Sequence, residues 1–337
     1  MRACIFSCEG TRLSKDEKSF FAEAQPWGFI LFGRNCESEA QIAALCADLR
    51  ETVGRYAPIL IDEEGGRVSR LRPLGGRIGP KAEVFAQSGL SPEDMGAAVR
   101  ANYAAIGARL ASIGIDVDCA PVLDLPATHA DPIIGDRAFS TDPAIAASLG
   151  QACLDGLNDG GVSGIIKHIP GHGRADVDSH KALPVVTVSQ EDLQAHDFLP
   201  FTALKNAPMA MTGHVIYNAF DPDNAATCSS IMIKEVIRGR IGFDGLLMSD
   251  DLDMKALRGR LAERTGAAIA AGCDVVLQCN GVLGDMREVA KAAPILSGEA
   301  LRRAKAARTG VSANALSRHE AEAQAEVWMA RIDGGRG

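Results

Sequence analysis

Short hydrophobic segments recur along the chain, and each is bounded by glycine or polar residues. They lie at residues 4–7, 27–32, 58–61, 117–123, 164–166, 209–211, 246–248 and 275–277. Most are hydrophobic at consecutive rather than alternate positions, which is typical of strands buried on both faces in a parallel sheet covered by helices. The pattern therefore predicts eight parallel strands.

The segments between these strands carry helix signals. Ser91 and Pro92 mark a helix start, because the serine hydroxyl can accept a backbone N–H and proline lacks an N–H where none is needed. Hydrophobic side chains follow at spacings of four and three residues, at Met95, Val99, Tyr103, Ile106, Leu110 and Ile113. Gly114 then ends the segment. Residues 142–160 and a segment that begins at Ser189 carry similar signals, so strands and helices are predicted to alternate.

This alternation predicts an α/β fold, a (β/α)8 TIM barrel. The chain has 337 residues, which is more than the ~250 of a typical barrel. We therefore expect residues 1–337 to form a single catalytic barrel domain with extra loops, ending in outer helices and a loose tail from about residue 302. A doubly wound open sheet is the alternative, but its GxGxxG fingerprint is absent after the first strand.

Composition narrows the class of partner. Asp and Glu number 43 against 35 Lys and Arg, a net charge of −8, and there is no long basic run. This argues against nucleic acid or an anionic membrane as the partner and favours a small molecule. No apolar stretch of ~18 residues and no secretory pattern occur, so we expect a cytoplasmic protein. The nine cysteines are scattered without a CxxC pair and are expected to be reduced, buried thiols.

Polar residues follow most of the later strands. They are Asp62, Asp124, Lys167 with His168, His214, Asp250 with Asp251, and Asn280. In a barrel the carboxyl ends of the strands meet at one mouth, where the active sites of such folds lie. For Asp124 alone, the cap of a following helix is an equally good interpretation.

Three of the seven histidines lie within one glycine-rich segment, residues 164–184. They are His168, His172 and His180, and Asp178 precedes the last by two residues. A metal site is one interpretation, although the spacings lack the HxxxH or HExxH pattern that places ligands on one helix face. Proton transfer by a histidine that a nearby carboxylate orients is the second interpretation, and a structural loop histidine is the third.

A second segment, IGFDGLLMSDDLDMKAL at residues 241–257, runs from a hydrophobic strand directly into two carboxylates. Asp250 at the strand end is held rigidly and could attack an electrophilic carbon from one side. The loop that carries His180 could supply a proton from the other side, which is the logic of a retaining glycosidase. Asp251 is then interpreted as a neighbour or a cap.

Four motifs together identify a family. KHIPGHG, followed four residues later by DSH, is combined with GFDGLLMSDDL, with ILIDEEGGRVSRL upstream and with AGCDVVLQCN downstream. This set closely resembles the β-N-acetylhexosaminidases of glycoside hydrolase family 3, over roughly residues 27–280. The length is similar to the short, single-barrel bacterial form of that family.

The resemblance implies a retaining exo-enzyme that removes terminal β-linked N-acetylglucosamine. In bacteria with this form, the substrates are disaccharide-peptides (GlcNAc-1,6-anhydro-MurNAc-peptides) of peptidoglycan recycling. By motif position, Asp250 would be the nucleophile and His180 the acid/base, with Asp178 as its partner. Sugar binding would fall to Asp62, Arg70, Arg137, Lys167 and His168.

The resemblance implies no cofactor and no metal, and a monomer is expected. Charged groups suit sugar recognition, because a carboxylate accepts hydrogen bonds from hydroxyls while Arg and Lys donate them. For Lys167 and Arg70, the alternative role is a structural ion pair with Asp62. Three other functions stay open: a metal-dependent barrel hydrolase, a non-catalytic sugar-binding protein, and a phosphorylase of the same family that transfers the sugar to phosphate.

Overall fold

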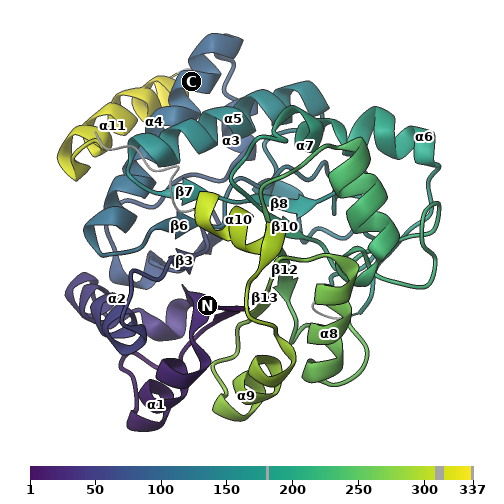
Figure 1. Cartoon of the computed structure of the whole chain (residues 1–337). Coiled ribbons are helices and arrows are strands. Elements are labelled where there is room, and N and C mark those ends of the chain that lie inside the picture. Colours follow the sequence, from purple (N-terminus) through teal and green to yellow (C-terminus); the bar gives the residue numbers. More distant parts are fainter. Residues whose placement is uncertain (180–181, 308–314, 335–337) are drawn as a thin grey trace.

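A computed structural model describes residues 1–179, 182–307 and 315–334 (Figure 1). Within these residues the main sheet is parallel throughout, with the strand order β7-β6-β3-β2-β1-β13-β12-β10-β8. Its strands are β1 (Arg2–Phe6), β2 (Pro26–Leu31), β3 (Ile59–Ile61), β6 (Val117–Asp118), β7 (Ser163–Gly164), β8 (Ile166–Ile169), β10 (Met209–Thr212), β12 (Leu246–Asp251) and β13 (Val275–Gln278). Each of the eight predicted hydrophobic segments contributes to this sheet.

The two ends of the strand order are one stretch of chain. β7 pairs with β6, β8 pairs with β10, and only Ile165 separates β7 from β8. The backbone N–H of Lys167 donates to Pro121, and that of Leu123 donates to Lys167, so β8 continues beside the chain that follows β6. The sheet therefore closes on itself, and the predicted (β/α)8 barrel is confirmed.

Side chains of the strands alternate between two hydrophobic clusters. Ile5, Leu60 and Met248 belong to the cluster inside the barrel, whereas Cys4 and Phe6 belong to the cluster between the sheet and the helices. Both clusters are buried, which explains why the strands are hydrophobic at consecutive positions rather than at alternate ones.

Helices surround the barrel (Figure 1). They are α1 (Lys15–Ala24), α2 (Glu39–Val53), α3 (Glu83–Ala86), α4 (Pro92–Ser112), α5 (Pro143–Asp159), α6 (Gln190–Asp192), α7 (Leu199–Ala203), α8 (Leu261–Ala271), α9 (Leu283–Ala292), α10 (Gly298–Ala306) and α11 (Arg318–Gly334). Two further segments, Leu193–Asp197 and Met232–Arg240, are π-helical. The predicted caps are present, because the side chains of Ser91, Asp142 and Ser189 each accept a backbone N–H of the first turn.

The C-terminal helices differ in part from the expected outer position. α10 crosses in front of the barrel in Figure 1, and its Ala304, with Ala307 just after the helix, joins the cluster inside the barrel. The indole N–H of Trp27 donates to the Ala304 carbonyl, which ties this helix to β2. α11 packs outside α4 through small side chains, among them Ala321 and Ala325. Residues 308–314 and 335–337, where part of the expected loose tail falls, lie outside the described residues.

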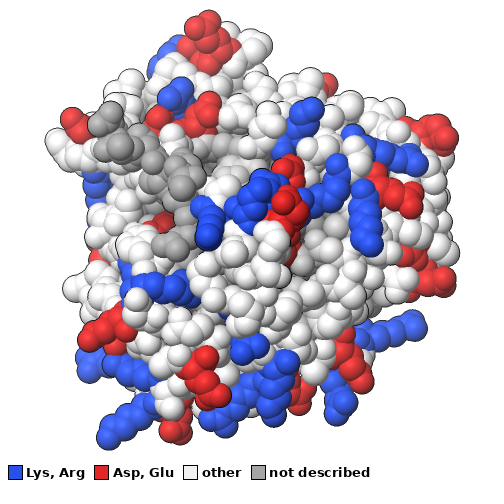
Figure 2. All heavy atoms as spheres, viewed as in Figure 1, with Lys and Arg blue, Asp and Glu red and all other residues white. Residues whose placement is uncertain are grey.

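Charged side chains on the face of α10 are intermixed in sign (Figure 2). Arg302 and Arg303 of α10 form ion pairs of 2.6 and 2.8 Å with Asp244. Within the described parts of the chain, no helix combines the length and the hydrophobicity needed to cross a bilayer.

Candidate active site

A cavity of about 280 Å³ lies at the carboxyl ends of the barrel strands. Its charged and polar wall is formed by Asp62, Glu64, Arg67, Arg70, Arg137, Lys167, His168, His172, Ser179, Asp250 and Asp251. All five predicted sugar-binding residues and the predicted nucleophile therefore line one cavity. Hydrophobic side chains also line the cavity, among them Ile30, Phe32, Met211 and Leu277.

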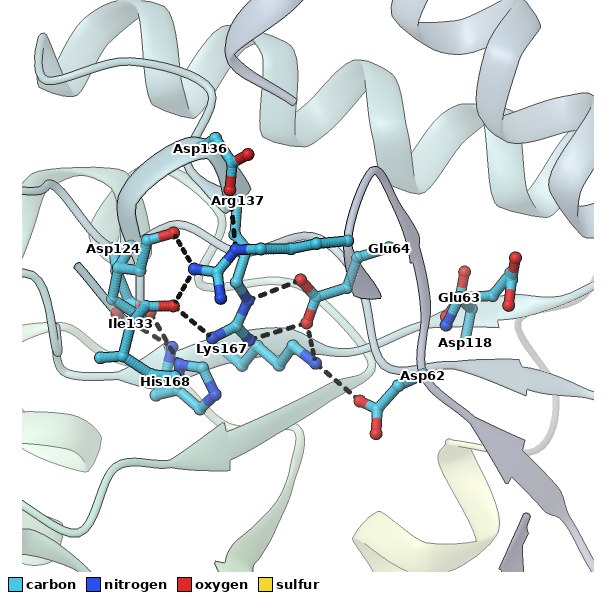
Figure 3. Close-up of polar contacts among 12 residues, drawn as sticks. Asp62, Glu63, Glu64, Asp118, Asp124, Ile133, Asp136, Arg137, Lys167 and His168 are labelled. Carbon is cyan, nitrogen blue, oxygen red and sulfur yellow. Dashed lines mark hydrogen bonds and ion pairs between the residues drawn. The ribbon is translucent and has the colours of Figure 1, made fainter. Parts of the chain in front are cut away.

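Lys167 is the centre of an ion-pair network (Figure 3). Its side chain is 2% exposed, and its ammonium nitrogen lies 2.8 Å from Asp62 Oδ1 and 2.6 Å from Glu64 Oε1. Arg137 donates two hydrogen bonds of 2.8 Å to Glu64, one to each carboxylate oxygen. Arg70 donates to the other oxygen of Asp62 at 3.0 Å. The network holds two carboxylates and three cations in fixed positions.

The network keeps these groups charged at neutral pH. Burial alone would raise the pKa of Asp62, but Lys167 and Arg70 hold that pKa well below its usual range. Burial is likewise outweighed at Glu64, where Arg137 and Lys167 lower the pKa to about 2. Asp62 and Glu64 in turn raise the pKa of Lys167, against the effect of burial. The ion pair that was the alternative role for Lys167 and Arg70 does form, and the same groups line the cavity.

Asp250 follows the buried part of β12 and is partly exposed to the cavity. Its Oδ1 accepts the backbone N–H of Asp251 at 2.7 Å. The side chain of Asp251 accepts the N–H groups of Asp253 and Cys279, each at 3.1 Å, so it caps the turn after the strand. Burial, together with the Asp250 carboxylate, raises the pKa of Asp251 to about 6. The strand end thus carries two carboxyls, of which that of Asp251 caps the turn.

Asp124 holds the histidine-rich segment rather than a helix. Its Oδ2 lies 2.7 Å from His168 Nδ1, and its Oδ1 accepts the backbone N–H groups of His168 and His172 at 3.1 and 2.7 Å. The helix-cap interpretation of Asp124 is therefore wrong. The ring of His172 lies 3.1 Å, Nε2 to Oγ, from Ser179. Burial and the neighbouring His168 lower the pKa of His172 to about 4, which keeps this ring neutral at neutral pH.

The predicted pair of Asp178 and His180 is described only in part. Asp178 is buried, and the adjoining Ser179 lines the cavity. His180 lies outside the described residues. The described chain therefore reaches the cavity wall at the residue next to His180.

Other polar strand ends serve the framework. His214 lies 2.7 Å from the Thr227 hydroxyl and 2.9 Å from the Asp251 carbonyl, so it ties the ends of β10 and β12 together. Asn280 donates to Asp253 and Asp285. Convergence at the mouth was predicted correctly, but these two side chains and Asp124 do not line the cavity.

Glu64 is one site residue that the sequence analysis did not predict. Asp62, Glu63 and Glu64 are consecutive in an extended segment, where side chains alternate between two sides. Asp62 and Glu64 consequently face Lys167 together, while Glu63 lies on the opposite side with Asp118 (Figure 3). A period of two from Asp62 would have identified Glu64.

Arg67 is a second residue that was not predicted. It pairs with Asp136 at 2.8 Å and donates to the carbonyls of Pro132 and Ile134. Ile133 and Ile134 line the cavity, so Arg67 holds one of its walls in place. Among the described residues, no group of three or more His, Cys, Asp or Glu side chains is arranged to hold a metal ion. His180, a ligand in the metal hypothesis, is not among them.

A closed barrel with acid–base and ion-paired groups at its carboxyl-terminal mouth is the framework of a barrel enzyme. Residues 5–308 match the model of the glycosyl hydrolase family 3 N-terminal domain, so the chain belongs to this family and is a glycoside hydrolase. The resemblance found in the sequence is thereby confirmed.

Relatives of the chain are similar over most of their length. A beta-hexosaminidase from Thiobacillus denitrificans is 38% identical over 277 residues, covering 80% of this chain and 76% of the relative. NagZ from Neisseria gonorrhoeae superposes with a TM-score of 0.85 at 29% identity, over 100% of this chain and 98% of that one. The Neisseria protein has also been solved in complex with N-trifluoroacetyl-D-glucosamine. A family 3 beta-N-acetylglucosaminidase from Paenibacillus is longer, and the chain covers 61% of it, at 28% identity and a TM-score of 0.79.

Proposed function

We propose that the protein is a retaining β-N-acetylhexosaminidase that hydrolyses terminal β-linked N-acetylglucosamine. The observation that carries the proposal is the position of Asp250, which lines the same cavity as the network of Asp62, Glu64, Arg137 and Lys167. The curated beta-hexosaminidase and the Neisseria complex with a glucosamine derivative support this choice of sugar.

The network suits a pyranose that presents a ring of hydroxyls. Asp62 can accept from sugar hydroxyls, while Lys167, Arg70 and Arg137 donate to their oxygens, and bonds to charged groups are stronger than those between neutral groups. His168 adds a ring nitrogen whose partner, Asp124, fixes its orientation. Because every charged group already has a partner, the pocket is preorganised before the sugar enters.

Chemistry would begin at Asp250. Its carboxylate attacks the anomeric carbon, forms a glycosyl–enzyme ester and breaks the bond to the glycosidic oxygen. His180, oriented by Asp178, gives its proton to that oxygen, so the aglycone leaves as an alcohol. In the second step, His180 takes a proton from a water molecule. The water oxygen attacks the anomeric carbon and breaks the ester bond to Asp250, which releases the sugar and restores the carboxylate. Two inversions give net retention.

The natural substrates we propose are GlcNAc-1,6-anhydro-MurNAc-peptides that arise during peptidoglycan recycling. Since such fragments are recycled inside the cell, we expect the enzyme to act in the cytoplasm. We also expect it to act as a monomer, with all catalytic groups supplied by one chain.

The test is release of nitrophenol from p-nitrophenyl N-acetyl-β-glucosaminide, in chelator, by the wild type beside Asp250→Ala. We expect hydrolysis by the wild type and a loss of about 10⁴-fold or more in the variant, because the nucleophile acts in the reaction rather than in ground-state binding. Binding of N-acetylglucosamine, measured by calorimetry, should persist in the variant. Near-normal turnover by Asp250→Ala would refute the assigned nucleophile, and a rate that depends on added phosphate would favour the phosphorylase.

Removal of His180 separates its role from that of Asp250. Nitrophenolate leaves with little protonation, whereas a sugar leaving group needs a proton. His180→Ala should therefore lose much more activity on a GlcNAc disaccharide than on the nitrophenyl glycoside. Equal losses on both substrates would contradict the acid/base assignment.

A further inference from the structure

The turn that presents Asp62 and Glu64 is held by a carboxyl outside the cavity wall. The ladder between β3 and β6 ends where Ile61 lies beside Asp118, with the N–H of Cys119 donating to the Ile61 carbonyl. The next free N–H on that side, that of Glu63, donates to the side chain of Asp118 at 2.9 Å. The Asp118 side chain thus takes the place that a strand carbonyl would occupy in a continued ladder.

The opposite side of the turn is also held. Glu63 begins β4 (Glu63–Gly65), which pairs antiparallel with β5 (Val68–Ser69). Its carboxylate accepts the hydroxyl of Ser69 and, at 3.1 Å, the N–H of Leu71. With the Glu63 amide and carboxylate both anchored, the backbone on either side of it has little freedom. Asp62 and Glu64 are the residues on either side.

Within the described part of the chain, no Lys or Arg side chain forms an ion pair with Asp118, and the Glu63 N–H donates to its side chain. It is 0% exposed, and its Oδ2 has no hydrogen-bond partner among the described residues. The nearby Lys167 is engaged by Asp62 and Glu64 at 2.8 and 2.6 Å. An ionised carboxylate in such a place is strongly destabilised, whereas a protonated one is destabilised far less.

We propose that Asp118 is a positioning residue of the sugar pocket, which holds the Glu63 amide and thereby fixes Asp62 and Glu64 around Lys167. The inference rests on the proposed function, and it assigns Asp118 no contact with the sugar. A good acceptor oxygen is the only property that this role requires, so a neutral side chain of the same shape performs it equally well.

The surroundings agree with a neutral Asp118. Burial is the main reason that its pKa lies well above the usual range. The hydrogen bond from the Glu63 N–H and the charge of Lys167 lower that pKa, whereas the charges of Glu63 and, more weakly, Asp62 raise it, and burial outweighs the opposing effects. Tyr103 of α4 and Cys153 of α5 face the same region, and burial raises the pKa of both, so neither is charged at neutral pH.

Two variants test the proposal. Asp118→Asn keeps the shape of the side chain and an acceptor oxygen, whereas Asp118→Leu keeps the branching with bulkier methyl groups and leaves the Glu63 N–H without a partner. We expect Asp118→Leu to raise the KM for p-nitrophenyl N-acetyl-β-glucosaminide and the Kd for N-acetylglucosamine about tenfold, the factor for one buried hydrogen bond, with a smaller change in kcat. Asp118→Asn should stay within about twofold of wild type.

A matched control separates positioning from general stability. Val117→Ala removes buried packing from the same strand without touching the turn, so it should lower the melting temperature and leave KM unchanged. If Asp118→Leu does not fold, Asp118→Ala is measured in its place. Unchanged KM and Kd in the variant without an acceptor, or equal damage by Asp118→Asn, would overturn the proposal.

The result for the wild type distinguishes a failure of the positioning role of Asp118 from a failure of the proposed hexosaminidase function. Wild-type hydrolysis together with unaltered sugar affinity in Asp118→Leu would remove the positioning role and leave the hexosaminidase assignment intact. A wild type that neither hydrolyses the glycoside nor binds N-acetylglucosamine would overturn both.

Discussion

At the residue scale, Lys167 shows how the pocket tolerates so much buried charge. A buried ammonium is stable only when partners replace its water, and here Asp62 and Glu64 do so at short distances. Such a network adds little to net folding stability, since desolvation offsets most of the attraction. Its value is geometric, because the donors and acceptors for a sugar are already in place.

The balance between desolvation and charge attraction in this network depends most on Glu64. Glu64→Gln leaves Arg137 and Lys167 with Asp62 as the remaining carboxylate of the network, and losing one partner of a buried pair costs about 3 kcal/mol. We expect that loss in urea unfolding at pH 7. Glu299→Gln is the control, because its pair with Arg302 is exposed to solvent and contributes little to stability.

The contribution of Glu64 to folding stability should depend on pH. The pKa of Glu64 is about 2 in the folded protein, against roughly 4.3 in an unfolded chain. A lowered carboxyl pKa gives stability that is present above the unfolded value and lost as pH falls through the folded one. The difference between wild type and Glu64→Gln should shrink between about pH 5 and pH 2. A constant difference across that range would show that Glu64 is not held ionised.

The contribution of Asp251 to folding stability should change with pH in the opposite direction. Its pKa is raised to about 6, so the folded protein binds a proton that the unfolded chain releases near pH 4. This group therefore favours folding most below about pH 4 and loses that advantage as pH rises to about 6. Between pH 4 and pH 7, the free energy of unfolding of Asp251→Asn should rise by about 2 kcal/mol relative to that of the wild type, measured by chemical denaturation. An identical pH dependence of both proteins would contradict the raised pKa.

Individual site residues differed in how far the sequence could reveal them. Asp62, Lys167, His168 and Asp250 come at or just after the ends of predicted hydrophobic segments, so strand prediction alone brings them to one mouth. Arg137 ends a short 3-10 turn, Gly135–Arg137, and was assigned only through the family resemblance. Asp118 sits inside a hydrophobic strand, where a carboxyl gives no sign of its partner, because that partner is a backbone N–H from another strand.

At the scale of elements, glycines set the distance between α4 and α5. A Cβ on Gly156 would lie 2.3 Å from the Arg100 carbonyl oxygen, and one on Gly160 would lie 2.5 Å from that of Ala104. The two helices therefore touch through their backbones. Helix periodicity predicted both helices, but close approach depends on which turn faces which, and that is decided by the barrel.

Gly156→Ala tests this contact. The added methyl meets backbone that cannot rotate away, so we expect a loss of about 2 kcal/mol or more and a lower melting temperature. Gly266→Ala is the control within α8, where a Cβ would meet nothing within 4 Å. That change should stabilise the protein by about 0.5–1 kcal/mol, as expected for alanine in place of glycine in an open helix position. Equal effects of both substitutions would refute the packing argument.

Strand ends were predicted less well than strand centres. The hydrophobic segment 117–123 predicted one long strand, but β6 spans only Val117–Asp118. Pro121 has no N–H to donate, so regular pairing does not continue through it. Residues 119–123 are still hydrophobic because the chain remains buried there. A hydrophobic segment therefore indicates burial and does not show how far strand pairing extends.

At the scale of the whole molecule, the nine cysteines are free thiols, and all except Cys228 are buried. Burial raises the pKa of Cys228 to about 11, so this thiol too is protonated at neutral pH. We expect almost no rapid reaction with a thiol reagent in native buffer and nine reacting groups in guanidinium chloride. Fast native reaction of several thiols would indicate an interior that opens far more readily than a closed barrel should.

The closure of the barrel also has a consequence for how the chain is made. β1 pairs with β13, and the partner of Ile5 is Leu277, so the first strand of the barrel is synthesised long before its partner, the last strand of the barrel. At about 5–20 residues per second, that interval is roughly 15 to 60 seconds. During it β1 presents an unpaired, apolar edge of the kind that recruits other strands. Growing chains on neighbouring ribosomes would meet through this edge, which makes chaperone cover during translation most valuable before residue 278 emerges.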